Sequence, residues 1–360
     1  MKRVLQVVYN MNDCGGIQSF IMNIYKHIDL KKVQFDFLLC EYSNSLYEKK
    51  IKELGGNIYI VPGRRNGIIK NKIELDKFFK KHKYDVVHYH SDSLSNIEPL
   101  IAAKNNGIET IIMHCHSTHV SGVLKPIYLL LHEINKKRID KIATNYLACS
   151  NQAKKWAYDD NINGVVIKNC IDIEKFNRNE IEDNKFKKEL GISDDAFVLC
   201  HTGRFEKVKN HEFILKVFLK IKERNDKAIL LLVGDGKLYD EISQKVENMN
   251  LQSSVKLLGV REDVNKILRI SDSFIYPSLY EGFGISLLEA EATGIPCVIS
   301  DKVPSDVVIN ENVIQKSLDD GIEQWTECIL NNNIKCNGLL NSDGYDIDST
   351  VNELMKIYNQ

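Results

Sequence analysis

The chain is organised around the stretch Ser278-Leu-Tyr-Glu-Gly-Phe-Gly-Ile-Ser-Leu-Leu-Glu-Ala290. The apolar run before it, at 273–277, predicts a short buried strand that closes in a proline. Residues 285–292 are strong helix formers, and Gly294 and Pro296 mark the end of the predicted helix. The stretch therefore predicts a strand, a glycine loop and a helix, in that order.

Two glutamates, Glu281 and Glu289, bracket the glycine loop. In one continuous helix they would lie about 12 Å apart along the axis, but Gly282 and Gly284 favour a loop that holds Glu281, with Glu289 about one turn into the helix. Amides at a helix N-terminus bind anions, and glycines let the backbone approach them closely. The pattern favours a nucleotide-sugar site, with Glu289 on the ribose and Glu281 near the sugar. Two surface glutamates are the alternative.

Length and composition limit the class of protein. A chain of 360 residues predicts two domains, and 43% hydrophobic with 27% charged residues is typical of a soluble globular protein. No apolar run reaches membrane-spanning length, and the N-terminus is too short and strand-like for a signal peptide. The nine cysteines contain no Cys-x-x-Cys pair, which predicts reduced core thiols in a cytoplasmic protein.

The near-zero net charge hides a difference between the two halves. Residues 1–170 carry 25 lysines and arginines against 16 aspartates and glutamates, whereas the remainder carries 23 against 33. The basic first half predicts an anionic partner, either a membrane surface or a phosphorylated acceptor. Ordinary surface lysines are the alternative, and nothing indicates nucleic-acid binding.

Strand-like apolar runs alternate with helical patterns along the whole chain, which is typical of parallel doubly wound sheets and here occurs twice. The runs lie at 4–9, 35–40, 57–61, 86–90, 110–115, 146–150 and 165–167, and then at 197–201, 228–233, 255–258, 273–276 and 297–300. The charged stretch 174–190 predicts an interdomain linker. We expect an N-terminal domain at 1–172, a linker at 173–192, a C-terminal domain at 193–342 and a terminal helix at 343–360.

In doubly wound sheets, ligands bind beyond the carboxyl ends of the strands. Gly15 and Gly16 follow the first strand and could meet a phosphate, although the Gly-x-Gly-x-x-Gly spacing of dinucleotide sites is missing. Gly203 and Arg204 follow a later strand, and Lys209 lies just before the next helix. These two cations suit a diphosphate, since one charge-assisted hydrogen bond contributes roughly 1.5–3 kcal/mol.

Two further strands end in glycine turns. Gly234 follows the strand at 228–233, and the segment containing Gly259, Val260 and Arg261 follows the strand at 255–258. We expect the first turn to approach the donor and the second to offer backbone groups to the edge of a base.

Histidines gather near two predicted strand ends, as His88 and His90 and then as His114 and His116, with His119 beyond. One hypothesis is a zinc site, although no cysteine or aspartate at typical spacing completes four ligands. The other is that most of them are buried strand residues or hydrogen-bonding groups that line a cleft. His116, at the very end of its strand, is the best candidate to contact substrate.

Taken together, the second half resembles the donor domain of a family 4 retaining glycosyltransferase with the GT-B fold. The segments that carry this resemblance are Gly203-Arg204, Lys209-Asn210, Val233-Gly-Asp-Gly236, Leu258-Gly259 and Glu281-Gly-Phe-Gly-Ile285 with Glu289-Ala290. The first half is similar more loosely, through Gly15-Gly16, Asp85-Val-Val-His88 and Asn169-Cys-Ile-Asp172. The patterns Ser300-Asp-Lys-Val-Pro304 and His114-Cys-His-Ser117 resemble the branch that builds bacterial exopolysaccharide and capsule.

The resemblance implies an α/β architecture of two Rossmann-like domains that face each other across a cleft, with the last helix crossing back to the first domain. It implies catalytic roles for Glu281, His116, Arg204 and Lys209. It implies donor binding by Gly15, Gly16, Gly203, Arg204, Lys209, Gly234, Val260, Arg261, Glu281, Phe283, Gly284, Ile285, Ser286, Leu287 and Glu289. Cys170 departs from the family, whose members usually carry glycine there, and this weakens the inference about the hinge.

The resemblance further implies transfer of a hexose or N-acetylhexosamine from a UDP-sugar to a lipid-linked oligosaccharide or glycan acceptor. No metal cofactor is expected, because no Asp-x-Asp follows a strand, and Asp346-Ile-Asp348 is better interpreted as a helix cap. We expect the protein in the cytoplasm or peripherally on the inner face of the membrane. A UDP-sugar 2-epimerase of the same fold and a non-catalytic nucleotide-sugar-binding subunit are the alternatives.

Overall fold

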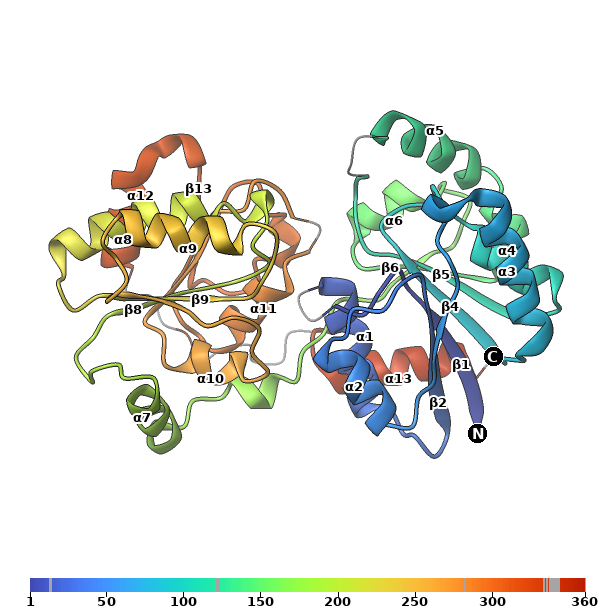
Figure 1. The fold of residues 1–360 in the computed structure, drawn as a ribbon, viewed down its shortest axis with the longest axis horizontal. Helices are drawn as coiled ribbons and strands as arrows, with labels where there is room; N and C mark the ends of the chain where they lie inside the picture. Colours follow the sequence, from blue (N-terminus) through green and yellow to red (C-terminus); the bar gives the residue numbers. More distant parts are fainter. Residues whose placement is uncertain are drawn as a thin grey trace. The chain divides into compact units, whose positions relative to one another are not determined.

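The structure is a computed structural model that describes residues 1–12, 15–120, 124–281, 283–332, 334, 336 and 344–359. The chain forms two units, one of residues 1–170 with 344–360 and one of residues 171–343 (Figure 1). The first unit therefore contains both ends of the chain. Among the described residues, no helix is long and apolar enough to cross a membrane.

The first unit is built on a parallel sheet of seven strands in the order β3-β2-β1-β4-β5-β6-β7. The strands are β1 (Lys2–Val7), β2 (Val33–Leu39), β3 (Ile58–Ile60), β4 (Val86–Ser91), β5 (Thr110–Cys115), β6 (Asn145–Ala148) and β7 (Val165–Val166). The helices are α1 (Gly16–His27), α2 (Leu46–Glu53), α3 (Ile68–Lys81), α4 (Glu98–Asn105), α5 (Lys125–Lys136), α6 (Asn151–Ala157) and α13 (Ile347–Tyr358), with 3-10 turns η1 (Arg64–Asn66) and η2 (Ile139–Lys141).

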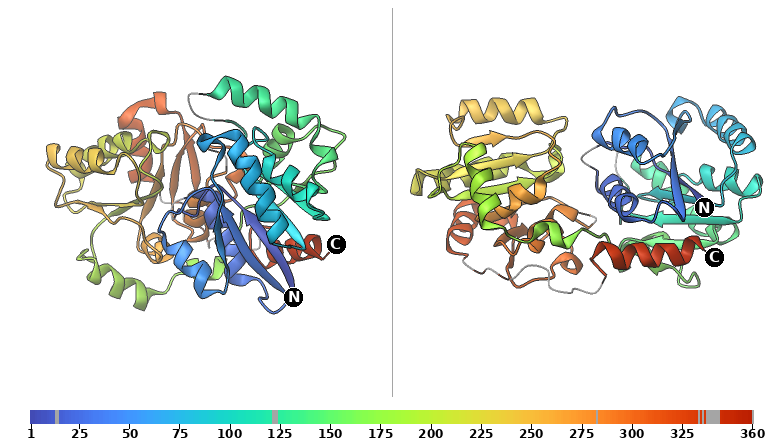
Figure 2. Two further views of the ribbon diagram at one scale, coloured as in Figure 1. Left: turned by 45° about the vertical axis from the view of Figure 1, so that its right-hand side comes forward. Right: turned by 90° about the horizontal axis from the view of Figure 1, so that it is seen from below.

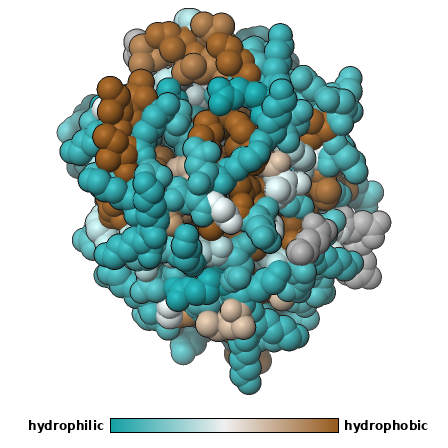
Figure 3. Space-filling view, turned by 90° about the vertical axis from the view of Figure 1, so that its right-hand side faces the viewer, coloured by the Kyte–Doolittle hydropathy of each residue, from teal (hydrophilic) through white to brown (hydrophobic). Residues whose placement is uncertain are grey.

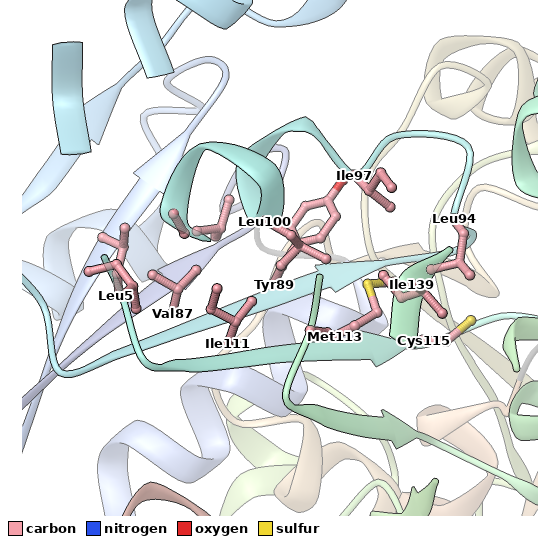
Figure 4. Close-up of a cluster of buried hydrophobic side chains, with 14 of the residues drawn as sticks. Leu5, Val87, Tyr89, Leu94, Ile97, Leu100, Ile111, Met113, Cys115 and Ile139 are labelled. Atoms are coloured by element: carbon pink, nitrogen blue, oxygen red, sulfur yellow. The ribbon is translucent and has the colours of Figure 1, made fainter. Parts of the chain in front are cut away.

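Different helices cover the two faces of this sheet. Because successive strand residues point to opposite faces, Leu5 and Val87 pack with α3 and α4 on one face (Figure 4). Their neighbours Val4 and Val86 pack with α1 and α13 on the other. Helix α13 lies beside α1 within this unit (Figure 2). The central strands are consequently buried on both sides, as parallel sheets require.

The second unit has a parallel sheet of six strands in the order β10-β9-β8-β11-β12-β13. The strands are β8 (Val198–Thr202), β9 (Ile229–Val233), β10 (Val255–Leu257), β11 (Ser273–Tyr276), β12 (Cys297–Ser300) and β13 (Val313–Lys316). The helices are α7 (Glu180–Glu189), α8 (His211–Arg224), α9 (Tyr239–Asn248), α10 (Val264–Arg269), α11 (Ile285–Ala292) and α12 (Gly321–Asn331), with 3-10 turns η3 (Ile173–Phe176), η4 (Lys207–Lys209), η5 (Ser305–Val307) and η6 (Leu318–Asp320).

Residues 173–192, which were expected to form an interdomain linker, belong to the second unit. This segment contains η3 and α7, and it packs onto α10 as part of the second unit. Arg269 on α10 donates to Asp183 (2.8 Å) and Glu182 (3.0 Å), and Phe186 supplies a buried apolar anchor. These ion pairs and one buried aromatic residue, rather than a continuous apolar face, hold α7, so the hydrophobic pattern did not reveal it.

Both sheets reverse their strand order at the same place. In each unit the first strand lies between the second and the fourth, so the chain crosses over between β1 and β4 and again between β8 and β11. Loops diverge at such a point and leave room for a ligand beyond the carboxyl ends of the strands. The two crossover points are therefore where functional side chains are expected.

Candidate active site

In the second unit, the loops that follow four neighbouring strands are joined into one row by backbone hydrogen bonds. The bonds run from Phe205 N–H to Asp235 O (2.9 Å), from Gly234 N–H to Gly259 O (2.8 Å) and from Leu279 N–H to Val208 O (2.8 Å). The row places the turns after β8, β9, β10 and β11 side by side at one edge of the sheet.

Gly234 is the tightest point of this row. Its φ is 132°, and a Cβ added there would lie 2.1 Å from the carbonyl oxygen of Gly203. Only glycine allows both this conformation and this approach. The predicted donor-site glycines Gly203 and Gly234 thus bring the ends of β8 and β9 together.

Lys209 is the centre of a partly buried polar cluster at the β8–β11 crossover. Its Nζ donates to Glu281 Oε1 at 2.7 Å and to the Tyr276 hydroxyl at 2.5 Å, and lies 4.5 Å from the centroid of the Tyr276 ring. The side chains of Lys209 and Glu281 are only 13% and 11% exposed. The structure therefore brings together two residues that were predicted to act at one site from positions 72 residues apart.

Tyr276 was missed by the sequence analysis, which assigned it only to a buried strand. The residue is fully buried, and desolvation, reinforced by the neighbouring Glu281 carboxylate, raises the pKa of its hydroxyl well above the usual value. It therefore remains a neutral group that accepts from Lys209. Its position as the last residue of β11, at the crossover, was the available signal.

Helix α11 begins at Ile285, as predicted, with Gly284 as an N-cap whose φ is 90°. No side chain caps this end, and within the described residues the amides of Ile285 and Ser286 have no hydrogen-bond partner. The Leu287 amide already donates to Gly284 O (2.9 Å), so that predicted contact is occupied. The free amides and the helix dipole leave this end suited to an anion.

Two carboxylates on α11 differ in their surroundings. Glu289 is half-buried, and desolvation raises its pKa to about 7. Glu291 is fully buried with its pKa also raised to about 7 by desolvation, and its Oε1 accepts from the amides of Ile309 (2.9 Å) and Asn310 (3.3 Å). Glu291 therefore holds the following loop, whereas Glu289 remains available to a ligand.

The two arginines predicted at this edge have other partners. The Arg204 side chain is 43% exposed, and its Nη1 lies 3.4 Å from Glu206 Oε1. Arg261, beside the half-buried Val260, forms a two-point ion pair with Asp263 at 2.8 and 2.7 Å. Neither joins the Lys209 cluster. Phe283 lies buried just before Gly284, while Gly282 lies outside the described residues.

The first unit carries a different polar cluster, on the α1/α13 face of its sheet. The hydrogen bonds are His90 Nδ1–His116 Nε2 (2.9 Å), His90 Nε2–Gln6 Oε1 (2.8 Å), Gln6 Nε2–Tyr358 hydroxyl (3.4 Å), Tyr358 hydroxyl–His88 Nδ1 (2.9 Å) and His88 Nε2–His114 Nδ1 (3.2 Å). Burial lowers the pKa of the three strand histidines well below the usual value and that of His116 to about 3.

The interpretation of His88, His90 and His114 as buried hydrogen-bonding residues is confirmed. Of the histidines in the zinc hypothesis, these three offer nitrogens within 4.8 Å of one another. Hydrogen bonds to neighbouring side chains occupy every ring nitrogen of this trio except His114 Nε2. A metal would therefore have to displace an existing network.

The glycine turn after β1 begins α1. Gly16 is the first helical residue, and a Cβ on Gly15 would lie 1.7 Å from Gln18 Oε1, because Gln18 folds back to donate to Asn10 O at 2.9 Å. The preceding Asp13 and Cys14 lie outside the described residues. The turn is closely packed against its own first helical turn.

Two family models match the chain in sequence, one for glycosyl transferases group 1 over residues 182–335 and one for Glycosyltransferase Family 4 over residues 14–175. The chain belongs to this glycosyltransferase family, and its two parallel-sheet units have the GT-B fold. As a member of this family, it is a glycosyltransferase.

Individual relatives agree with this assignment. The putative glycosyltransferase EpsF of Bacillus subtilis is 32% identical over 372 residues, which cover 99% of this chain and 96% of that protein. The UDP-Gal:alpha-D-GlcNAc-diphosphoundecaprenol alpha-1,3-galactosyltransferase of Escherichia coli is 29% identical over 91% of this chain and 81% of its own. The crystal structure of Alr3699/HepE from Anabaena, in complex with UDP and glucose, matches with a TM-score of 0.76 and 16% identity over the full length of both chains.

Proposed function

We propose that the chain is a retaining, metal-independent glycosyltransferase. It moves a hexose or N-acetylhexosamine from a UDP-sugar to a lipid-linked oligosaccharide or glycan acceptor in cell-surface polysaccharide synthesis. The observation that carries this proposal is the Lys209–Glu281–Tyr276 cluster beside the uncapped start of α11. The name of the E. coli relative, with its UDP-sugar donor and diphosphoundecaprenol acceptor, and the UDP complex of HepE support the choice of substrates.

These residues are proposed to stabilise the UDP leaving group. An ammonium has three donors, and Lys209 directs two of them to Tyr276 and Glu281, which leaves one for a phosphate oxygen. The amides of Ile285 and Ser286 supply two more donors, and the exposed Arg204 can turn from Glu206 to add a positive charge. Donors fixed in place before the sugar bond breaks stabilise the charge that develops on the diphosphate. These cations take the place that a metal ion would otherwise fill.

Glu289 is proposed to accept hydrogen bonds from the ribose hydroxyls, and Glu281 to contact the sugar or its phosphate. From the first unit, Gly16 and His116 are proposed to contact the phosphate and the transferred sugar. His116 is neutral and half-buried at the end of β5, which suits a hydrogen bond to a sugar hydroxyl rather than a charge interaction.

The test is calorimetric binding of UDP, GDP and ADP with and without EDTA. We expect selective UDP binding that ignores EDTA and weakens about 10- to 100-fold in Arg204→Ala, because one charge-assisted hydrogen bond is lost. Arg224→Ala is the matched control, since Arg224 pairs with Glu327 (2.6 Å) at the far end of α8. Absence of nucleotide binding would contradict the proposal. Release of an epimerised UDP-sugar, or UDP binding without turnover, would favour the epimerase or the non-catalytic subunit.

We also propose that helix α5 docks the first unit on the inner, anionic face of a membrane. Unlike an ordinary surface helix, α5 directs polar side chains toward the protein and apolar side chains toward the solvent. Its inner side is held by His132, which accepts from the Leu94 amide (3.1 Å), and by Asn135, which donates to Leu94 O (2.7 Å). Its outer side presents Ile127 and Leu130, exposed by 52% and 63%.

This outer face also includes Leu124 and Ile134, and Figure 3 shows apolar residues gathered at the top of the first unit, where Figure 1 places α5. Exposed Lys125, Lys137 and Arg138 lie at its ends. An apolar stripe between basic residues is typical of helices that lie in an anionic membrane interface. Each basic residue near such a surface adds about 1 kcal/mol of attraction.

Vesicle sedimentation tests this contact. We expect the protein to bind phosphatidylglycerol vesicles and to bind phosphatidylcholine vesicles weakly, with binding lost in the double variant Ile127→Ser/Leu130→Ser. Ile181→Ser is the control, because Ile181 on α7 is 84% exposed in the second unit. Equal loss in the control, or equal binding of both lipids, would overturn the proposed docking face without touching the proposed chemistry.

A further inference from the structure

One continuous chain of hydrogen bonds crosses the interior of the first unit. It links three strands and the last helix, and its members are His116, His90, Gln6, Tyr358, His88 and His114. Gln6 on β1 lies at the middle of this chain. Its amide is the one member whose donor atom and acceptor atom cannot exchange roles. The oxygen can only accept and the nitrogen can only donate. The orientation of this amide therefore sets the direction of every other bond in the chain.

The direction can be followed one bond at a time toward His116. Gln6 Oε1 accepts at 2.8 Å from His90 Nε2, which must carry the proton. A neutral imidazole has one N–H, so His90 Nδ1 is an acceptor. His116 Nε2, 2.9 Å away, must then be the donor. The proton position is assigned from this pattern of partners, as it must be when hydrogens are not observed.

The other half of the chain continues in the same direction from the amide nitrogen. Gln6 Nε2 donates to the Tyr358 hydroxyl (3.4 Å), the hydroxyl donates to His88 Nδ1 (2.9 Å), and His88 Nε2 donates to His114 Nδ1 (3.2 Å). Reversing the amide would require each histidine of the chain to change its tautomer and the Tyr358 hydroxyl to turn round. All of these side chains except His116 are at least nine-tenths buried, so water cannot take over a broken bond.

The remaining nitrogen of His116 lies at the ligand edge of the sheet. His116 follows β5 directly and is half-buried, and its Nδ1 has no hydrogen-bond partner among the residues that the structure describes. Phe20 of α1 packs against its ring at a centroid distance of 5.5 Å. Gly16 lies one turn earlier on the same face of α1, toward the helix start. The free nitrogen and the glycine turn thus belong to the same end of the unit.

We propose that Gln6 and His90 are positioning residues that hold His116 as its Nε2–H tautomer, so that Nδ1 accepts a hydrogen bond from a hydroxyl of the donor sugar. This inference rests on the proposed function, in which His116 contacts that sugar. It adds a selection rule, since a sugar that carries a hydroxyl at this point is bound and one that carries only an acceptor, such as fluorine, meets a lone pair. Neither Gln6 nor His90 touches the substrate in this scheme.

The direct test is nitrogen-15 NMR of the histidine rings in the full-length protein, which distinguishes protonated from unprotonated ring nitrogens. In the wild type, we expect His116 to show a protonated Nε2 and an unprotonated Nδ1. Gln6→Met removes the acceptor that fixes His90 and should let His116 populate both tautomers. Gln34→Met is the matched control, because Gln34 on β2 bonds Tyr25 at 2.5 Å and not the histidines. That control should leave the His116 signals unchanged.

The kinetics of sugar transfer supply a second test. Loss of one neutral hydrogen bond costs about 0.5–1.5 kcal/mol, so kcat/KM should fall roughly 2- to 12-fold in Gln6→Met and in His90→Phe. Because Gln6 acts only through His90, the double variant should be no slower than His90→Phe alone. Additive losses, a protonated Nδ1 on wild-type His116, or a His116 tautomer unmoved by Gln6→Met would each overturn the inference. Absence of any transfer would instead contradict the proposed function, and the wild-type spectrum would still decide the tautomer.

Discussion

The two crossover points of this molecule have the same topology and different chemistry. At the β8–β11 crossover, the polar groups stand in the loops and form an ion pair, Lys209 with Glu281 at 2.7 Å. At the β1–β4 crossover, they stand within the strands and form a line of neutral imidazoles, whose members His88 and His90 are buried in β4. Strand order thus determines where a ligand can bind, and the residues at the crossover determine which part of the ligand is recognised.

Under the proposed function, the charged part of a nucleotide sugar contacts the second unit and the uncharged part contacts the first. A diphosphate needs cations and free amides, which the second unit supplies. A sugar needs neutral groups that donate and accept, which the first unit supplies. Equal losses of transfer activity from substitutions at the two sheet edges would contradict this division.

The largest expected effect is on transfer by Lys209→Met. Removal of a fixed donor from the leaving group costs roughly 10²–10³ in rate, and we expect the same range for Glu281→Ala, because Glu281 holds the ammonium in place. His116→Ala should cost only about 10-fold, the loss of one neutral hydrogen bond. Steady-state kinetics on variants with unchanged circular dichroism measure these losses. Equal losses at Lys209 and His116 would end the distinction between the two edges.

A smaller effect is expected on stability when the glycine row is disturbed. Gly234→Ala places a Cβ 2.1 Å from Gly203 O at a φ of 132°, and backbone strain with overpacking costs ~3 kcal/mol in the free energy of unfolding. Gly107→Ala in the first unit is the control, because its φ is +80° but nothing lies within 4 Å of the added Cβ. Denaturant titration should show only about 1 kcal/mol there. Similar costs at both sites would mean that conformation alone, and not the packing of this row, explains Gly234.

The pH dependence of UDP binding is expected to arise in the second unit and not in the first. Desolvation raises the pKa of Glu289 to about 7, and in the proposed function its carboxylate accepts hydrogen bonds from the ribose hydroxyls. Bound UDP therefore favours the unprotonated form, so affinity should rise as pH increases toward 7 and level off above it. Below pH 7 the loss should approach about tenfold per pH unit.

The histidine cluster of the first unit cannot produce this profile, because burial lowers the pKa of His116 to about 3 and lowers the pKa of His88, His90 and His114 well below the usual range. Calorimetry between pH 5 and 8 on Glu289→Gln should give weaker binding, with only the shallower slope that protonation of the terminal UDP phosphate (pKa about 6) produces. Glu291→Gln should keep the slope, since that side chain only holds the loop at Ile309. A slope in Glu289→Gln as steep as that of the wild type would move the titrating group elsewhere.

The smallest effect concerns the last helix. Asp346 caps α13 by accepting from the Ser349 amide at 2.9 Å, so its interpretation as a helix cap is confirmed. Asp346→Ala should lower the free energy of unfolding by about 1 kcal/mol and leave UDP affinity unchanged. A change in UDP affinity measured by calorimetry would indicate that Asp346 acts at the donor site rather than as a cap.

Local sequence signals predicted much of this architecture. The strand at 273–276 and the helix at 285–292 agree with β11 and α11, because glycine and proline bound both elements. The edge strand β13 was missed, since its polar, partly exposed residues give no continuous apolar run. The helix α7 was missed because Arg269, far along the chain, holds it by ion pairs.

The sequence predicted which residues belong to the site but not which of them contact one another. Lys209 and Glu281 stand in recognisable loops, whereas Tyr276 looks like any buried strand aromatic until the crossover brings it to Lys209. The pairing of His90 with His116 depends on the register between β4 and β5. The contact of Gln6 with Tyr358 joins residues 352 positions apart. No periodicity in the sequence encodes such contacts.

The placement of α13 has a consequence for how the protein is made. Residues 171–343 interrupt the first unit, so a ribosome releases the whole second unit before it releases the helix that completes the first. Until Tyr358 emerges, β1 and β4 lack a buried neighbour, and Gln6 and His88 lack a hydrogen-bond partner. Folding of the second unit can therefore be complete while the first unit still lacks the helix α13.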